Sequence, residues 1–341
     1  MADLVDNRIV TDIKSILLAA RERVAKSVNN ELVFAYWNIG KLIVEYEAIN
    51  EIGDNEDITV ISQLSKELTK ELGKGFSRSN LFNMKRLFQK YPKIQTLSGL
   101  SWSHYCELLS VSDDNARSFY EKEAQNSNWS VRELKRQIDT SLFERVLLSD
   151  GKANKQKVLE LAEKGITYSE PGDIIKDPYV FEFLGIPENK PILEKDLEKA
   201  LIEKIEKFLL ELGRGFMFVG SQQRITIGNT HYYVDMVFYN KILKAYVLID
   251  LKIGSLKPEN AGQMNAYLNY YATEVNDDGD EKPIGIILCA NASEVVAEYA
   301  LGGLENQIFA SKYTYYIPNK DTLIKQVESV IKDLDSDNSD K

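Results

Sequence analysis

Three strand-like runs follow one another closely in the second half of the chain, and they constrain its fold more than any other feature. Helical patterns surround them. The predicted order is helix, three strands, helix, strand, helix, strand and helix, over residues 193–212, 216–227, 232–239, 245–253, 259–273, 284–290, 295–301, 308–317 and 321–334. Strands interleaved with helices in this way predict an α/β sandwich with a mixed sheet.

The first half of the chain has a different pattern. Apolar residues recur at helical spacing from Ile9 to Tyr46, and further helical segments follow up to about residue 148. A chain of 341 residues normally forms two domains. We therefore expect an all-α domain over 1–150, a connecting segment over 151–191, an α/β domain over 192–334 and a disordered polar tail over 335–341.

Composition excludes several classes of protein. The chain has two histidines, too few for a zinc site of several histidines, and it has no P-loop motif. It shows no signal peptide and no apolar run long enough to span a membrane, so we expect a cytoplasmic protein without a membrane partner. The net charge of −10 does not by itself indicate a nucleic-acid partner.

Three ionisable residues interrupt two of the apolar strands. Asp250 and Lys252 stand two apart, so they point to the same face of their strand, and Asp235 lies in the strand before. If the two strands form a hairpin, the carboxylates of Asp235 and Asp250 meet across it. Two carboxylates repel unless a cation joins them, and Mg²⁺ prefers such ligands. A neighbouring lysine can orient water and stabilise a charged transition state.

The spacing of these residues also permits a simpler interpretation. Asp250 and Lys252 could form a surface ion pair on an edge strand, with Asp235 exposed. An Asp-x-Lys tripeptide is common, so the spacing alone leaves both interpretations open.

The surrounding sequence resembles the PD-(D/E)xK nuclease superfamily, and within it the YhcG-like bacterial proteins. The resemblance is carried by the order of elements, by the strand segments ending in Val234-Asp235 and Ile249-Asp250-Leu251-Lys252, and by Gly262-Gln263-Met264-Asn265-Ala266-Tyr267. It extends into the first half through Gly75-Phe76-Ser77-Arg78-Ser79-Asn80. Val234 stands where the motif's proline is expected. The resemblance implies a restriction-endonuclease-like αβββαβ core in the C-terminal domain, and a helical N-terminal domain of unknown role.

The resemblance also implies roles for single residues. Asp235 and Asp250 would bind Mg²⁺ or Mn²⁺, and Lys252 would position the attacking water. Glu211, at the end of the first core helix, would complete the metal site, although a solvent-facing glutamate is an equal alternative. Gln263 would assist near the scissile phosphate. Gln223 and Arg224, on the first strand, are weaker candidates for phosphate contacts.

A basic segment lies in the helical half. Between residues 66 and 93 there are eight basic and two acidic residues, a net charge of +6. Two helices flank a glycine-containing turn there, as in a helix-turn-helix reader of DNA. The candidate DNA contacts are Lys74, Arg78, Asn80, Lys85 and Arg86. A helical hairpin with a solvated basic face, or a protein-docking surface, is equally consistent with this pattern.

Three functions follow from these observations. The leading one is a metal-dependent DNA endonuclease, for which the family setting suggests genome defence or mobile-element processing. The second is a module with a nuclease fold that binds nucleic acid or an assembly partner without cutting. The third is a helical adaptor whose first half forms a homo-oligomer or binds a partner protein.

Overall fold

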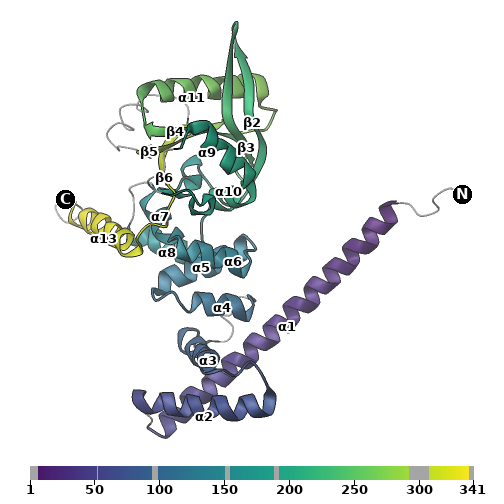
Figure 1. The fold of residues 1–341 in the computed structure, drawn as a ribbon, viewed down its shortest axis with the longest axis vertical. Helices are drawn as coiled ribbons and strands as arrows, with labels where there is room; N and C mark the ends of the chain where they lie inside the picture. Colours follow the sequence, from purple (N-terminus) through teal and green to yellow (C-terminus); the bar gives the residue numbers. More distant parts are fainter. Residues whose placement is uncertain are drawn as a thin grey trace, which may run out of the picture. The chain divides into compact units, whose positions relative to one another are not determined.

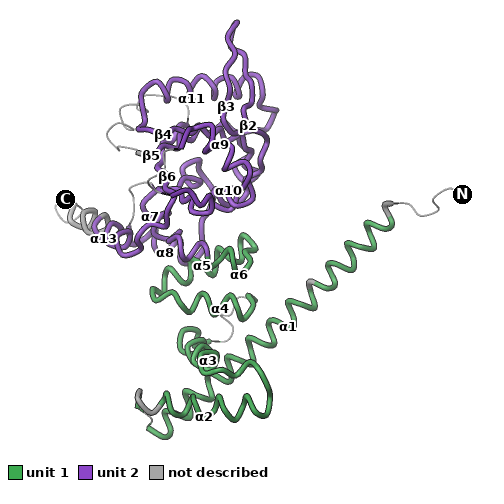
Figure 2. The backbone as a smooth tube through the Cα atoms, viewed as in Figure 1, with its two compact units in different colours: residues 1–135 green, residues 136–341 purple. Residues whose placement is uncertain are grey.

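A computed structural model describes residues 7–51, 53–93, 99–149, 154–187, 192–291 and 307–337. The chain divides into two compact units, residues 1–135 and 136–341 (Figure 2). The first unit is helical and the second contains all six strands assigned in the described residues. Each unit is considered by itself below.

The first unit is built around a long helix. It contains α1 (Asn7–Ile49), α2 (Asp54–Leu72), α3 (Arg78–Lys90), α4 (Trp102–Leu108), α5 (Asp114–Asn126) and the start of α6 (Val131–Asp139). The second half of α1 packs against α3 so closely that a Cβ added at Gly40 would lie 2.0 Å from the carbonyl oxygen of Met84. Glycine at this position therefore allows the two helix backbones to approach.

The spacing of apolar residues and an N-terminal cap explain why α3 forms where it does. Leu81, Met84 and Leu87 recur every three residues and are fully buried. The helix begins after Ser77, whose side chain accepts a hydrogen bond from the backbone N–H of Asn80.

The second unit holds the mixed sheet. Its elements are α7 (Leu142–Leu148), α8 (Lys155–Lys164), β1 (Tyr179–Val180), α9 (Glu194–Glu203), α10 (Ile205–Leu212), β2 (Phe216–Ile227), β3 (Thr230–Asn240), β4 (Ala245–Ser255), α11 (Pro258–Tyr270), β5 (Ile284–Asn291), β6 (Gln307–Thr314) and α13 (Lys320–Asp337), as Figure 1 shows. The strand order is β1-β6-β5-β4-β3-β2.

Strand direction changes at β4. The β2–β3 and β3–β4 pairs are antiparallel, whereas β4–β5, β5–β6 and β6–β1 are parallel. The predicted mixed sheet is thus confirmed, and so is the predicted order of one helical segment, three strands, a helix and a strand. The helical segment contains α9 and α10, because the backbone of Lys204 leaves the helical region between them.

Side chains along β4 alternate between two separate hydrophobic cores, one on each face of the sheet. Val247, Ile249 and Leu251 face a core that also contains residues of α9 and α10, whereas Leu248 joins a core with residues of α11. The sheet therefore has helices on both faces, as α/β domains require. Asp250 and Lys252 share the parity of Leu248, so the interruption of the apolar pattern lies on the side of the sheet that α11 covers.

Parts of the expected connecting segment belong to this unit. Tyr179 and Val180 form β1 at the edge of the sheet, and Phe181 is fully buried in the core beside it. Further along, the expected helix over 295–301 lies outside the described residues. Helix α13 extends to Asp337, into the expected tail, and residues 338–341 are not described.

Candidate active site

The register of β3 against β4 sets the relationship of the two strand aspartates. The antiparallel ladder pairs Val237 with Leu248 and Met236 with Ile249. One further step along the same register brings Asp235 opposite Asp250. Residues opposite one another in an antiparallel pair project to the same face. The two carboxylates therefore occupy neighbouring positions on one face, as the hairpin interpretation of the sequence required.

The carboxylate of Asp235 is held by two hydrogen bonds. Its Oδ2 accepts from the backbone N–H of Leu251 over 2.9 Å, which satisfies a donor on β4 beyond the last paired residues. Its Oδ1 accepts from Nε2 of Gln222 over 3.2 Å. Two donors from different strands fix the orientation of this side chain.

Asp250 is the more buried of the two strand aspartates, with 3% of its surface exposed. Burial raises its pKa to about 7, against the attraction of the Lys252 ammonium, and the negative charge of Asp235 adds to the rise. Because Nζ of Lys252 lies 2.7 Å from Oδ2 of Asp250, and Asp235 stands opposite Asp250 in the strand register, the three groups share one site. Positive charge beside Asp250 therefore favours its ionised form.

Lys252 lies within reach of two carboxylates. Its Nζ is 2.7 Å from Oδ2 of Asp250 and 3.3 Å from Oε1 of Glu194. Burial opposes the charged form of Lys252, but the negative charge of Asp250 outweighs it and raises the pKa of the ammonium. Lys252 is therefore a charged hydrogen-bond donor at neutral pH.

Three residues of the site escaped the sequence analysis, namely Glu194, Glu198 and Gln222. Glu198 lies on α9 and is 7% exposed, and its Oε2 accepts from Nε2 of Gln222 over 2.7 Å. The same amide reaches Asp235, so Gln222 bridges the two carboxylates. Burial raises the pKa of Glu198, and the charge of Asp235 contributes to the rise.

Backbone conformation explains how Gln222 forms this bridge. Its φ of 47° lies in the left-handed region, and the β2–β3 register shifts nearby, between Phe218 and Gly220. Such irregularities redirect side chains near functional sites. No sequence pattern predicts that a glutamine adopts a left-handed backbone conformation. Glu198, by contrast, stands one residue after the buried Leu197 on a predicted helix, a position that helical geometry could have flagged.

Gln263 lies on α11, beside the same cluster. Its amide donates to the hydroxyl of Tyr267, which donates in turn to the carbonyl of Tyr233 over 3.3 Å. The charges of Asp250 and Asp235 contribute to a raised pKa of Tyr267, whose main cause is burial. The amide of Gln263 is thus hydrogen-bonded to the Tyr267 hydroxyl, whose pKa the charges of Asp250 and Asp235 help to raise.

Glu211 has a different environment. It is fully buried at the end of α10, where its Oε1 accepts from Arg145 over 2.5 Å and its Oε2 from Arg136 over 3.0 Å. The backbone N–H of Val180 also donates to Oε1. These arginines outweigh the effect of burial and lower the pKa of Glu211 to about 2. The structure therefore gives Glu211 two arginine partners and groups Glu198 and Glu194, rather than Glu211, with the strand residues.

The donor set around β3 and β4 fits a divalent cation. Asp235, Asp250, Glu194 and Glu198 are electrostatically coupled around a single strand lysine, an excess of negative charge that a hard cation would neutralise. Among the described residues, no group of three or more His, Cys, Asp or Glu side chains is arranged to hold a metal ion. Mg²⁺ commonly uses only one or two carboxylates and completes its shell with water and substrate phosphate.

The remaining candidates on the sheet are exposed. Gln223 and Arg224, consecutive residues of β2, are both exposed, and Arg224 is paired with the exposed Tyr233 in the β2–β3 ladder. The amide of Gln223 reaches only the carbonyl of Ser221, at 3.5 Å. Both residues are accessible to a ligand.

The basic candidates of the helical unit fall into two groups. Lys85 is paired with Glu47 and Asp57, each at 2.7 Å, and Arg86 donates to the carbonyl of Leu109. Asn80 accepts from the indole of Trp102 over 2.9 Å and donates to a turn carbonyl. These three side chains hold the unit together. Lys74 and Arg78, by contrast, are exposed.

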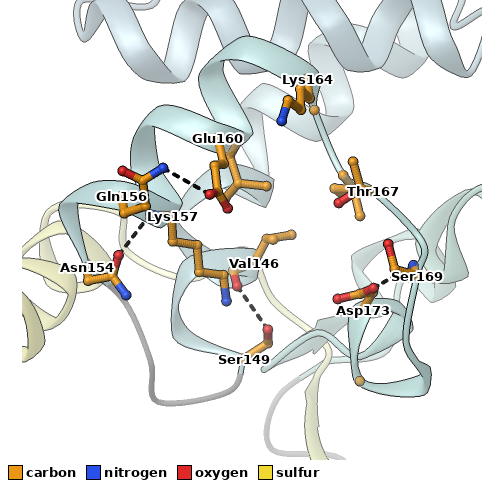
Figure 3. Close-up of a pocket in the computed structure, with 14 residues that line it drawn as sticks. Val146, Ser149, Asn154, Gln156, Lys157, Glu160, Lys164, Thr167, Ser169 and Asp173 are labelled. Atoms are coloured by element: carbon orange, nitrogen blue, oxygen red, sulfur yellow. Dashed lines mark hydrogen bonds between the residues drawn. The ribbon is translucent and has the colours of Figure 1, made fainter.

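A hollow in the sheet-containing unit is separate from this cluster. It has a volume of ≈ 610 Å³ and lies among α7, α8 and the segment that follows (Figure 3). Lys157, Glu160 and Asp173 contribute polar groups to it. None of the predicted site residues lines it. No described helix combines the length and apolarity that crossing a membrane requires.

Comparisons with known proteins agree with this geometry. Residues 172–328 match the model of the YhcG PDDEXK nuclease domain, and residues 12–145 match the DUF1016 N-terminal domain. The Escherichia coli (strain K12) protein named "Putative nuclease YhcG" is 36% identical over 342 residues, which cover 91% of this chain and 90% of that protein.

A solved structure described as a repair endonuclease from Pyrococcus abyssi aligns with 39% of this chain and 50% of its own, at 17% identity and a TM-score of 0.26, a likeness too distant to bear on function. The two domain models and the Escherichia coli relative together cover nearly the whole sequence. The chain therefore belongs to the YhcG family of proteins, which join a DUF1016 N-terminal domain to a PDDEXK nuclease domain.

Proposed function

We propose that this protein is a metal-dependent DNA endonuclease whose active site is the cluster around Asp235, Asp250 and Lys252. The observation that carries the proposal is the burial of Asp250 beside a second carboxylate and a lysine. Buried like charges are costly, and a fold retains them mainly where a cation or a reaction uses them.

Each residue of the cluster has a role in this proposal. Asp235 and Asp250 hold Mg²⁺ or Mn²⁺, and Glu198 adds negative charge beside them on the α9 side. A divalent ion bound there supplies positive charge that polarises the scissile phosphate and lowers the pKa of water. Lys252 donates hydrogen bonds to the attacking water and to the phosphate oxygens as their charge develops.

Two amides support these groups. Gln222 fixes the carboxylates of Asp235 and Glu198 relative to each other, so both point into the site before substrate arrives. Gln263, through Tyr267, positions the wall of the site that α11 contributes. Outer partners of this kind commonly change metal affinity or activity by about 10–100-fold when they are removed.

Exposed groups beside the cluster suit nucleic acid. Arg224 on β2 and Tyr233 on β3 are both exposed and paired in the ladder, and Tyr233 stands two residues before Asp235 on the same strand. An arginine can pair with phosphate, and an exposed aromatic ring can stack on a base. In the helical unit, Lys74 and Arg78 flank the start of α3 and provide further phosphate contacts.

The test is cleavage of linear and circular duplex DNA by the purified chain, with and without Mg²⁺ or Mn²⁺. Asp250→Asn and Lys252→Met should each abolish cleavage while the circular dichroism spectrum is unchanged. Full activity in EDTA, or undiminished cleavage by Asp250→Asn, would refute the proposal. Cleavage of RNA but not DNA would retain the site and reject the substrate. Tight DNA binding without cleavage in either metal would favour the second candidate, a non-cleaving module.

A further inference from the structure

The first half of α1 carries an uncovered apolar stripe. Ile13, Leu17, Val24 and Val28 are all more than half exposed, with Val24 at 64%. They are spaced by four or seven residues, so they lie on one face of the helix. Ala20 is on the same face. This stripe, residues 13–28, is here called the α1 ridge.

The ridge lies on the face of α1 that points away from its packing partner. Val33, Trp37 and Gly40 belong to the face that meets α3, where the Trp37 indole donates to the carbonyl of Tyr91 over 2.7 Å. A helix of 43 residues is about 65 Å long. Its first half has no described core residues around it, and helices in water depend mainly on tertiary packing for stability.

The other end of α1 borders an open apolar groove. The groove has a volume of ≈ 880 Å³ and lies between the end of α1 and α2. Leu42, Tyr46 and Ile49 line its α1 side and are themselves exposed. These residues continue the face that carries the ridge, because Leu42 lies fourteen residues after Val28. One helix face thus carries a ridge at one end and a groove at the other.

We propose that two copies of this chain pair antiparallel along α1, each placing its ridge in the groove of the other. A two-fold axis makes every contact occur twice, so a single arrangement covers both ridges and both grooves. Parallel pairing would bring ridge against ridge and groove against groove, so neither groove would receive a ridge. Only the antiparallel arrangement accounts for both surfaces.

Charge also favours this occupant. Lys14 and Arg21 stand three residues before and four residues after Leu17, so they border the ridge, and both are exposed. The charged residues that line the groove, Glu45 and Glu67, are acidic and exposed. Antiparallel pairing brings the basic border of one copy to the acidic lining of the other.

The first experiment measures the mass of the full chain in solution by light scattering or analytical ultracentrifugation. Wild type should have twice the chain mass of 38.8 kDa. Leu17→Glu with Val24→Glu should give monomers, and so should Tyr46→Glu with Ile49→Glu. Leu18→Glu is the matched control, because Leu18 is 63% exposed but lies about 100° around the helix from Leu17. It should leave the dimer intact.

The second experiment tests the direction of pairing with two charge-reversed variants. Lys14→Glu with Arg21→Glu, and Glu45→Lys with Glu67→Lys, should each weaken self-association at least tenfold. An equimolar mixture should form heterodimers, because the acidic ridge of one variant meets the basic groove of the other, and the unaltered ridge and groove meet as in wild type.

Several outcomes would overturn the proposal. A monomeric wild type would leave the surface to some other partner. A dimer that survives the ridge substitutions would place the interface elsewhere. A dimer that survives the groove reversal, or a mixture that stays monomeric, would exclude the antiparallel arrangement. Circular dichroism of each exposed-surface variant separates loss of pairing from loss of fold.

Discussion

The carboxylate of Asp235 accepts a hydrogen bond from the backbone N–H of Leu251 over 2.9 Å. This contact separates the structural role of Asp235 from its charge. Asparagine can accept the same bond through Oδ1, so Asp235→Asn should keep the unfolding free energy within about 1 kcal/mol of wild type. It should nevertheless lose Mg²⁺-dependent cleavage. Urea unfolding and a cleavage assay measure the two effects, and retained cleavage would remove Asp235 from the site.

Gln222 and its neighbour Gln223 provide a matched pair. Gln222→Ala removes the amide that joins Glu198 to Asp235 and should weaken metal affinity and cleavage by about 10–100-fold. Gln223→Ala removes an exposed amide whose contact is a 3.5 Å approach to Ser221, and it should leave metal affinity unchanged. The two variants are compared by calorimetric titration with Mg²⁺ and by the rate of DNA cleavage at saturating metal. Equal effects from both substitutions would contradict a bridging role.

The acidic residues of the second unit show which parts of the site could be predicted from the sequence. Asp235, Asp250 and Lys252 were identifiable because charges stand out in apolar strands, and side-chain alternation fixes their faces. The choice between Glu198 and Glu211 depends on tertiary structure. Both lie on the same predicted helical segment, but only the structure shows that Arg136 and Arg145 converge on Glu211. Those arginines are more than sixty residues away in sequence, beyond any local pattern.

The pairing of Glu211 predicts a pH-dependent contribution to stability. Its pKa falls from 4.5 to about 2 in the folded state. The stabilisation is therefore complete above pH 4.5 and is lost as the pH falls through 2, and it amounts to about 3 kcal/mol. Glu211→Gln should destabilise the protein by about 3–5 kcal/mol at pH 7, because Arg145 remains buried without its partner. Urea unfolding at pH 7 and below pH 3 should show this difference shrink. An unchanged difference would reject the assignment.

The fold was largely predictable, and the exceptions have local causes. Periodicity located α1, and the three clustered strands implied the mixed sheet. Sequence could not show that Lys204 leaves the helical region and divides α9 from α10, or that Tyr179 and Val180 add a strand to the sheet edge. A two-residue strand carries no measurable alternation, and its pairing with β6 joins residues far apart in the chain.

We predict that substitution of Lys85 lowers the stability of the helical unit rather than its affinity for DNA. Its side chain is 14% exposed and lies 2.7 Å from both Glu47 and Asp57, and these ion pairs raise its pKa although burial opposes its charge. Lys85→Met should leave the two acids facing each other and cost about 3 kcal/mol of unfolding free energy. Urea denaturation measures the loss. A Lys85→Met variant as stable as wild type would mean that the triad contributes nothing.

Lys74 and Arg78 give the cleaner test of DNA contact in the helical unit. Both side chains are exposed, so Lys74→Glu with Arg78→Glu should leave the melting temperature unchanged. DNA affinity should fall, and the slope of log affinity against log salt should become shallower by about two, since about one counterion is released for each phosphate contact. Fluorescence anisotropy with duplex DNA at several salt concentrations measures both quantities. Lys66→Glu with Lys70→Glu, on the preceding helix, reverses the same charge at exposed positions of the basic segment and controls for net charge. If both pairs weaken binding equally, the contribution is the general field of the segment; if neither does, the helical unit does not bind DNA through this face.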